Sequence, residues 1–172
     1  MTRRRHASRG VALLEALIAL AILGASLLGL LYMQLRTMAD TESALRQTQA
    51  LHLIDDLAER IRSNPEGLRE LGSYRSGWGP AAEPGVDCES QWCSPAQLAR
   101  WDLARWKRNL ALALPRGDAT VFDPAELPAG ATRRMLGVMV AWHSRLGESV
   151  EVSVPGASCP ADHVCQFGHV QP

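Results

Sequence analysis

The chain has 172 residues with 18 basic and 18 acidic side chains, a length that suggests one modest globular domain beside its N-terminal segment. Four of the 18 basic residues are arginines within positions 1–10, so 14 remain against 18 acidic residues in the body that follows. A mildly acidic body argues against a nucleic-acid-binding protein, because phosphate contacts need a concentrated basic surface.

An apolar segment follows the basic residues directly. Residues 11–33 read VALLEALIALAILGASLLGLLYM, and their one acidic side chain is Glu15. A helix of this length spans about 34 Å, whereas the hydrocarbon core of a bilayer is about 30 Å thick. The positive-inside rule places residues 1–10 in the cytoplasm and the body of the protein on the other side of the membrane.

Three interpretations of this N-terminus compete. A secretory signal peptide has an apolar region of roughly 7–15 residues that a small-residue cleavage site closes, but this run is longer and no such site ends it. An uncleaved anchor accounts for the length and the basic flank. It leaves Glu15 unexplained, because a carboxylate inside a membrane helix costs on the order of 3 kcal/mol. The third interpretation rests on the junction between the basic and apolar segments.

The junction Arg9-Gly10-Val11-Ala12-Leu13-Leu14-Glu15 resembles the class III signal of type IV prepilins. The resemblance implies that prepilin peptidase cleaves between Gly10 and Val11, that Val11 is then N-methylated, and that Glu15 becomes the fifth residue. Val11 stands where this family usually has Phe. The resemblance also implies that Glu15 pairs with the terminal amine of a neighbouring subunit during assembly, since an acid in lipid needs a partner.

The helical pattern continues beyond the apolar segment. Residues 34–63 contain no Gly or Pro, and their apolar residues recur mostly at helical spacing. Asn64-Pro65 and Gly67 then supply a stop signal. We predict one helix over residues 12–63, about 78 Å long, with a transmembrane half at 11–33 and an amphipathic periplasmic half at 34–63. A coiled coil is the alternative for the second half, but strict heptads are not sustained.

The remaining residues, 64–172, are expected to form a globular head. Ser94, Pro95 and Gln97 are typical of a helix start, and an apolar stripe from Ala99 to Ala113 predicts a helix over 95–113. Apolar and polar residues then alternate with period two, which predicts a β-hairpin over 135–154 with one solvent-exposed face. Short strands near 119–122 and 165–170 extend the sheet. The predicted fold is α+β, with a long N-terminal helix packed on a small antiparallel sheet and a connecting helix.

Two segments of the head sharpen the resemblance. Residues 50–67 and 93–117 are similar to the PilV family of type IV minor pilins, also called type IV pilus modification proteins. This implies a non-enzymatic subunit of the inner membrane, later of the pilus, that helps to initiate assembly. The implied partners are prepilin peptidase, other minor and major pilins through the N-terminal helix, and inner-membrane lipid. A type II secretion pseudopilin and a membrane-tethered periplasmic binding or enzymatic domain remain as alternatives.

The four cysteines, Cys88, Cys93, Cys159 and Cys165, all follow the membrane segment, so disulfides in an oxidising compartment are expected. We favour local pairing, 88 with 93 and 159 with 165, although four cysteines allow three connectivities. A zinc site involving His163 and His169 is the alternative, but only the first cysteine pair has the usual ligand spacing. We therefore predict neither a metal nor a cofactor.

The sequence shows no catalytic constellation, because its Ser, His and Asp residues lack a recognisable triad spacing. Two of the five tryptophans, Trp106 and Trp142, are expected in the core. Trp92 and Trp101 are the better candidates for contact with a partner, since Trp is enriched at binding hot spots.

Overall fold

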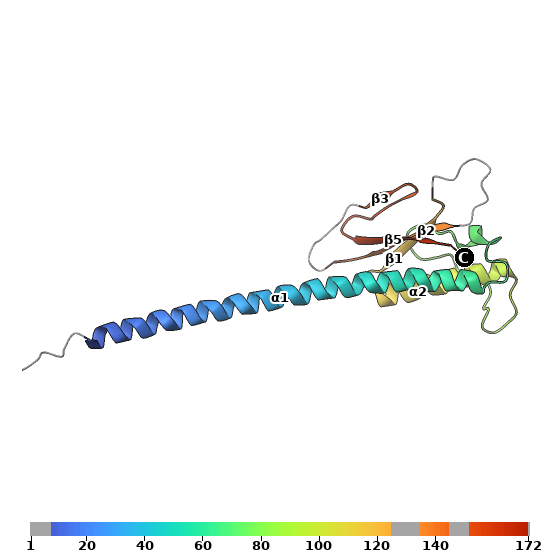
Figure 1. The fold of residues 1–172 in the computed structure, drawn as a ribbon. Helices are drawn as coiled ribbons and strands as arrows, with labels where there is room; N and C mark the ends of the chain where they lie inside the picture. The colour runs from blue at the N-terminus through green and yellow to red at the C-terminus, as the bar shows by residue number, and fades with distance from the viewer. Residues whose placement is uncertain (1–7, 125–134, 145–151, 172) are drawn as a thin grey trace, which may run out of the picture. The chain divides into compact units, whose positions relative to one another are not determined.

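The structure is a computed structural model that describes residues 8–124, 135–144 and 152–171. Its helices are α1 (Ser8–Ser63), the 3₁₀ helix η1 (Leu71–Tyr74) and α2 (Pro95–Ala113). Its strands are β1 (Asp118–Phe122), β2 (Leu136–Trp142), β3 (Ser153–Val154), β4 (Ala157–Ser158) and β5 (Val164–Val170). Figure 1 follows these elements from α1 in blue to β5 in red. The chain forms two compact units, Met1–Glu42 and Ser43–Pro172.

The described part of the first unit is the N-terminal portion of α1, a helix of 56 residues in all. This helix confirms the predicted long N-terminal element. Its apolar stretch also carries hydroxyl groups, which bond to the helix itself. Ser26 Oγ donates to the Ile22 carbonyl at 2.8 Å, and Thr37 Oγ1 donates to the Met33 carbonyl at 2.9 Å. These bonds satisfy polar atoms that would otherwise be costly in an apolar environment.

The second unit is built around the last turns of α1, which pack with α2 and one face of a three-stranded sheet. Trp106 of α2 is fully buried, and its Nε1 donates to the Leu53 carbonyl of α1 at 2.7 Å. The core members contributed by these elements include Ile54, Leu57, Ile61, Leu103, Trp106, Leu110, Val121, Val138, Val140 and Trp142. The α+β fold with a connecting helix is therefore as predicted.

The connecting helix α2 starts with a capping box. The Ser94 hydroxyl accepts from the Gln97 N–H at 3.4 Å, and the Gln97 side chain accepts from the Ser94 N–H at 2.9 Å. Pro95 occupies the first helical position, where its missing N–H costs nothing. These local bonds explain why the start of α2 is readable from the sequence.

The sheet has the strand order β1-β2-β5 and is antiparallel throughout, with Val121 opposite Val138 and Val140 opposite Gln166. The strand β2 lies in the centre, and all seven of its residues are buried. A separate two-stranded ribbon pairs β3 with β4.

The predicted β-hairpin over 135–154 is wrong in its pairing. The strand β2 bonds to β1 and β5, whereas residues 153–154 bond to 157–158. The prediction of a solvent-exposed face is also wrong for β2, because Met139 and Ala141 on its second face are as buried as Val138 and Val140. A strand that is apolar on both faces suits the centre of a sheet. Residues 145–151 of the predicted hairpin lie outside the described residues.

The end of α1 depends on a close backbone approach. The N–H of Gly67 donates to the Asn64 carbonyl at 2.9 Å, and a Cβ at position 67 would lie 2.0 Å from the Ile61 carbonyl oxygen. The Asn64 Oδ1 accepts from the Glu66 N–H at 3.2 Å. The turn that follows the helix therefore closes against the last turn of α1 only with glycine at position 67.

We expect Gly67→Ala to lower the free energy of unfolding by about 2 kcal/mol, because the new methyl group overlaps backbone that cannot move aside. Gly77→Ala is the matched control, since a Cβ at Gly77 meets nothing within 4 Å, and it should change stability by less than about 1 kcal/mol. Urea unfolding of the full chain in detergent, followed by tryptophan fluorescence, measures both. Equal midpoints for the two variants would contradict this account of the turn.

Candidate functional site

The three predicted processing and assembly residues lie together near the start of α1. Gly10 is in the helix, and Val11 and Glu15 are both exposed. Because residues four apart on a helix are surface neighbours, the Glu15 carboxylate lies one turn from Val11 on the same side. The helix thus fixes the spacing between the acid and the position that would become the new N-terminus.

The surface around Glu15 is apolar on all sides. Every large apolar side chain from Val11 to Met38 is more than half exposed. Among the described residues, α1 is the one helix long and apolar enough to cross a membrane. A helix that is apolar all round requires lipid or other helices to cover it. This surface is therefore suited to a membrane and to helix-helix assembly.

A buried polar network connects α1, η1 and α2 in the second unit. Asn64 Nδ2 donates to the Tyr74 hydroxyl at 3.2 Å, and that hydroxyl donates to Asp102 Oδ2 at 3.5 Å. Arg60 Nη1 lies 3.6 Å from Asp102 Oδ1, and Arg60 Nε bonds Asp56 at 3.0 Å. The network holds the end of α1 to the middle of α2.

Burial dominates the titration of this network. Burial raises the pKa of the Asp102 carboxyl above its usual value, although the Arg60 guanidinium acts in the opposite direction. Burial also raises the pKa of Tyr74 to about 12, so the phenol stays protonated and keeps donating to Asp102 at neutral pH.

A buried lysine connects α2 to the segment before it. Lys107 Nζ donates to the carbonyl oxygens of Gly77, at 2.8 Å, and of Gly79, and it lies 3.5 Å from Asp118 Oδ1. Asp118 Oδ2 in turn accepts from the Gly79 N–H at 2.6 Å. Burial lowers the pKa of the Lys107 amine against the opposing effect of Asp118. The lysine thus anchors a Gly- and Pro-rich connection to a regular helix.

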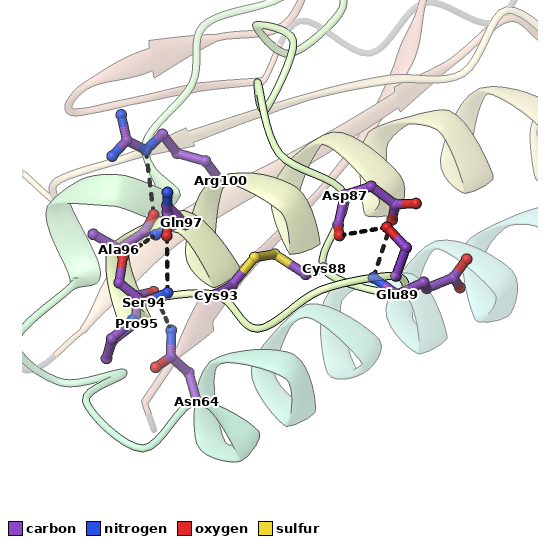
Figure 2. The surroundings of a disulfide bond; sticks show 11 residues. Asn64, Asp87, Cys88, Glu89, Cys93, Ser94, Pro95, Ala96, Gln97 and Arg100 are labelled. Atoms are coloured by element: carbon purple, nitrogen blue, oxygen red, sulfur yellow. Dashed lines mark hydrogen bonds between the residues drawn. A yellow bond between two sulfur atoms is a disulfide. The ribbon is translucent and has the colours of Figure 1, made fainter.

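The first disulfide, Cys88–Cys93, closes a loop directly before α2 (Figure 2). Closing so short a loop stabilises the fold by about 2 kcal/mol in the chain-entropy account. Asp87, directly before the loop, accepts through Oδ1 from the Glu89 N–H at 3.0 Å, and Glu89 forms an ion pair with Arg105 of α2. Trp92 in this loop is 86% exposed.

The second disulfide joins Cys159 to Cys165 at the start of β5, so the chain has the local pairing that we favoured. His163 lies beside His143, with ring centroids 6.2 Å apart, whereas His169 packs edge-to-face with Phe167 at 4.6 Å. The structure thus brings each cysteine pair together but does not gather His163 and His169. Within the described ranges no group of three or more His, Cys, Asp and Glu residues could hold a metal ion.

The tryptophans divide as the sequence indicated for the core. Trp106 and Trp142 are buried, Trp101 is partly buried beneath the Arg105 guanidinium at 4.9 Å, and Trp92 is exposed.

The sequence did not indicate Asp102 or Lys107 as important residues. Both lie on α2 next to a residue of its buried stripe: Asp102 comes directly before Leu103, and Lys107 comes directly after Trp106. A charge beside such a stripe is the one available signal.

The long helix and small antiparallel sheet together define a type IV pilin-like α+β fold. Residues 32–104 match the family model described as Tt1218-like, type IV pilin Tt1218. The match covers the second part of α1, the connection and the first half of α2, and it supports a type IV pilin. Searches of curated proteins and of solved structures gave no match.

The network around Asp102 predicts a specific pH dependence. Because the folded-state pKa is raised, the contribution of Asp102 to stability is fully present below its unfolded value of 3.8 and is lost as pH rises through the folded value. Asp102→Asn keeps an acceptor for Tyr74 but removes the titration. The stability of wild type relative to this variant should fall as pH rises above about 4, by at most about 1.4 kcal/mol per pH unit. Urea unfolding of both proteins between acid and neutral pH measures the difference, and parallel curves would contradict the assignment.

Proposed function

We propose that this protein is a minor pilin of the PilV type, processed by prepilin peptidase, N-methylated at Val11, and built into the type IV pilus through α1. The observation that carries the proposal is the apolar surface of α1, with one acid held one turn from Val11. The pilin family match, which overlaps α1 from residue 32 onward, supports a pilin role. The similarity of residues 50–67 and 93–117 to PilV proteins favours a minor subunit.

In this proposal the subunit resides in the inner membrane before assembly. The apolar side chains from Val11 to Met38 are covered by inner-membrane lipid, and the second unit lies in the periplasm. Cleavage after Gly10 removes a basic leader and creates an α-amino group that stays cationic after methylation. An isolated Glu15 in lipid costs on the order of 3 kcal/mol. Pairing Glu15 with the amine of a neighbouring subunit offsets that cost. The pair forms when the two helices are aligned at one position along the fibre axis.

The second unit has a structural role in this proposal. Its charged residues Asp102 and Lys107 are used to hold elements together, and the pilin family is one of structural proteins. Other pilins are the expected partners, and initiation of the fibre is the expected task. A type II secretion pseudopilin would share the processing and the helix, so fibre content separates it from a pilin.

The processing step makes a direct prediction about mass. Co-expression with a prepilin peptidase should yield a protein that lacks residues 1–10 and carries one added methyl group on Val11. Gly10→Leu should block cleavage, because the peptidase reads a small residue at that position, whereas Ser8→Ala should be cleaved normally. Intact-mass spectrometry distinguishes the products. A wild-type N-terminus that the peptidase leaves unchanged would exclude both a pilin and a pseudopilin.

The role of Glu15 makes a separate prediction about assembly. Glu15→Ala should be processed normally, yet its amount in sheared pili should fall about tenfold or more, because loss of a desolvated charge pair exceeds about 1.4 kcal/mol. Asp40→Ala, which removes an acid beyond the apolar segment of the same helix, should leave that amount unchanged. Immunoblots of sheared pili and of membranes measure both variants.

Entry of Glu15→Ala into pili at the wild-type level would contradict the pairing. Absence of the wild-type protein from sheared pili, together with normal processing, would favour a pseudopilin.

A further inference from the structure

Two histidines face each other where β2 ends and β5 begins. These strands lie side by side (Figure 1), and their register pairs Trp142 with Val164. The residue after Trp142, His143, therefore stands opposite the residue before Val164, His163. The two rings lie with their centroids 6.2 Å apart at an interplanar angle of 72°. The histidines thus form a cross-strand pair, although they are far apart in the chain.

The backbone of His143 determines which kind of cross-strand pair this is. Its N–H donates to the Pro115 carbonyl at 2.9 Å, on the side of β2 that pairs with β1. The hydrogen-bonding groups of His143 therefore point away from β5, so its pair with His163 is of the non-hydrogen-bonded kind. In such pairs the Cα atoms are about 4.5 Å apart, and the side chains are closer than in hydrogen-bonded pairs. Two imidazoles at this spacing can reach a common ligand.

The hydrogen bonds of the two rings determine which nitrogen atoms are available. His143 Nδ1 bonds the Asp162 carbonyl at 3.1 Å, and His163 Nδ1 bonds the Ala161 carbonyl at 2.8 Å. A carbonyl oxygen only accepts, so each Nδ1 carries the proton and donates. The Nε2 of each neutral ring then keeps its lone pair. Metal-binding histidines commonly have this arrangement, in which one ring nitrogen donates to the backbone and the other binds the ion.

The pair lies on the face of the sheet that is turned away from α1. A Cβ at Gly168 would lie 3.3 Å from the Ile54 side chain of α1, so this position of β5 faces the helix. Side chains alternate along a strand, which places His163 and the residue opposite it on the other face. Both histidines are partly exposed. An ion can therefore approach the pair from solvent without passing through the core.

We propose that His143 and His163 form a binding site for a divalent transition-metal ion, which both rings bind through Nε2. Two metal–nitrogen bonds of about 2.0 Å put the Nε2 atoms at most about 4 Å apart. Rings with centroids 6.2 Å apart meet this condition when each turns its Nε2 toward the other. With two protein ligands, water fills the remaining positions, and binding is weaker than at a structural zinc site. This inference does not depend on the proposed pilin function.

The ligand chemistry indicates which ions the site takes. Imidazole suits Zn²⁺, Cu²⁺ and Ni²⁺, whereas Mg²⁺ and Ca²⁺ prefer oxygen ligands. All four cysteines are paired in disulfides, so thiolates do not compete for the ion. The site also differs from the zinc site considered from the sequence. His169, the second histidine of that site, stands opposite Gly137 in the register and has no ligand across from it.

The first test titrates the full chain in mild detergent with Zn²⁺ and, separately, with Cu²⁺ in an isothermal calorimeter. Cu²⁺ should bind more tightly than Zn²⁺, following the general order for nitrogen sites. His143→Gln and His163→Gln should each weaken binding about tenfold or more, because the second imidazole binds at a high effective concentration once the first has bound. The matched control is His169→Gln, an exposed histidine of the same strand, which should leave the affinity unchanged.

A double variant tests whether the two rings bind one ion together. Either single substitution already removes the two-ring site, so His143→Gln with His163→Gln should weaken binding by much less than the product of the two single effects. Metal binding should also raise the urea midpoint of the wild type, since the unfolded chain lacks the cross-strand pair. Neither single variant should show this rise at the same Zn²⁺ concentration.

Three results would overturn the proposal. The first is a wild type that binds neither Zn²⁺ nor Cu²⁺. The second is a His169→Gln variant that loses as much affinity as His143→Gln, because the ion would then be held elsewhere. The third is a double variant whose loss equals the product of the single effects, as expected for two independent histidines. Circular dichroism confirms that each variant is folded.

Discussion

The constraint on which the rest of this structure depends is that α1 carries two different side-chain surfaces on one backbone. Away from its ends, the backbone groups of a helix bond to each other, so one helix can be stable against lipid as well as against protein. What changes along it is the side-chain surface. From Val11 to Met38 the large apolar groups are exposed, and from Ala50 to Ile61 they are part of the core.

The head is organised around the second of these surfaces. Trp106 bonds the Leu53 carbonyl and fills the space between α1 and α2, and the central strand β2 covers the same core from the sheet. Polar bonds then fix the irregular parts. Asp102 holds the end of α1, Lys107 holds the connection near Gly77, and the Cys88–Cys93 disulfide holds the loop before α2. The connection from Gly67 to Cys93 therefore needs little secondary structure of its own.

The parts of the fold that could be predicted from the sequence are those set by local bonds. The start of α2 rests on Ser94, Pro95 and Gln97, which are neighbours in the chain, and its bounds agree with the prediction. The partner of β2 could not be predicted, because three antiparallel strands can be ordered in several ways and the alternation of residues 148–154 suited a hairpin. The order depends on β5, whose sequence carries only a weak strand pattern.

The same distinction applies to the site. The spacing of Gly10, Val11 and Glu15 is a sequence property that the helix preserves, and the cysteine pairs are close in the chain. Asp102 contacts Tyr74 and Arg60, and Lys107 contacts Gly77, all of them 28 to 42 positions away in the chain, so no local pattern shows that these charges are buried. The path of the turn after α1 likewise depends on how it folds back on the last turn of the helix, which the composition of residues 64–69 does not specify.

The buried position of Lys107 has a consequence for chemistry on this protein. It is the single lysine of the chain, against 17 arginines, and its side chain is 4% exposed. In the folded protein, reagents that modify amines under mild conditions therefore have almost no access to the lysine side chain. A dye or biotin attached to Lys107 would report that the head has opened.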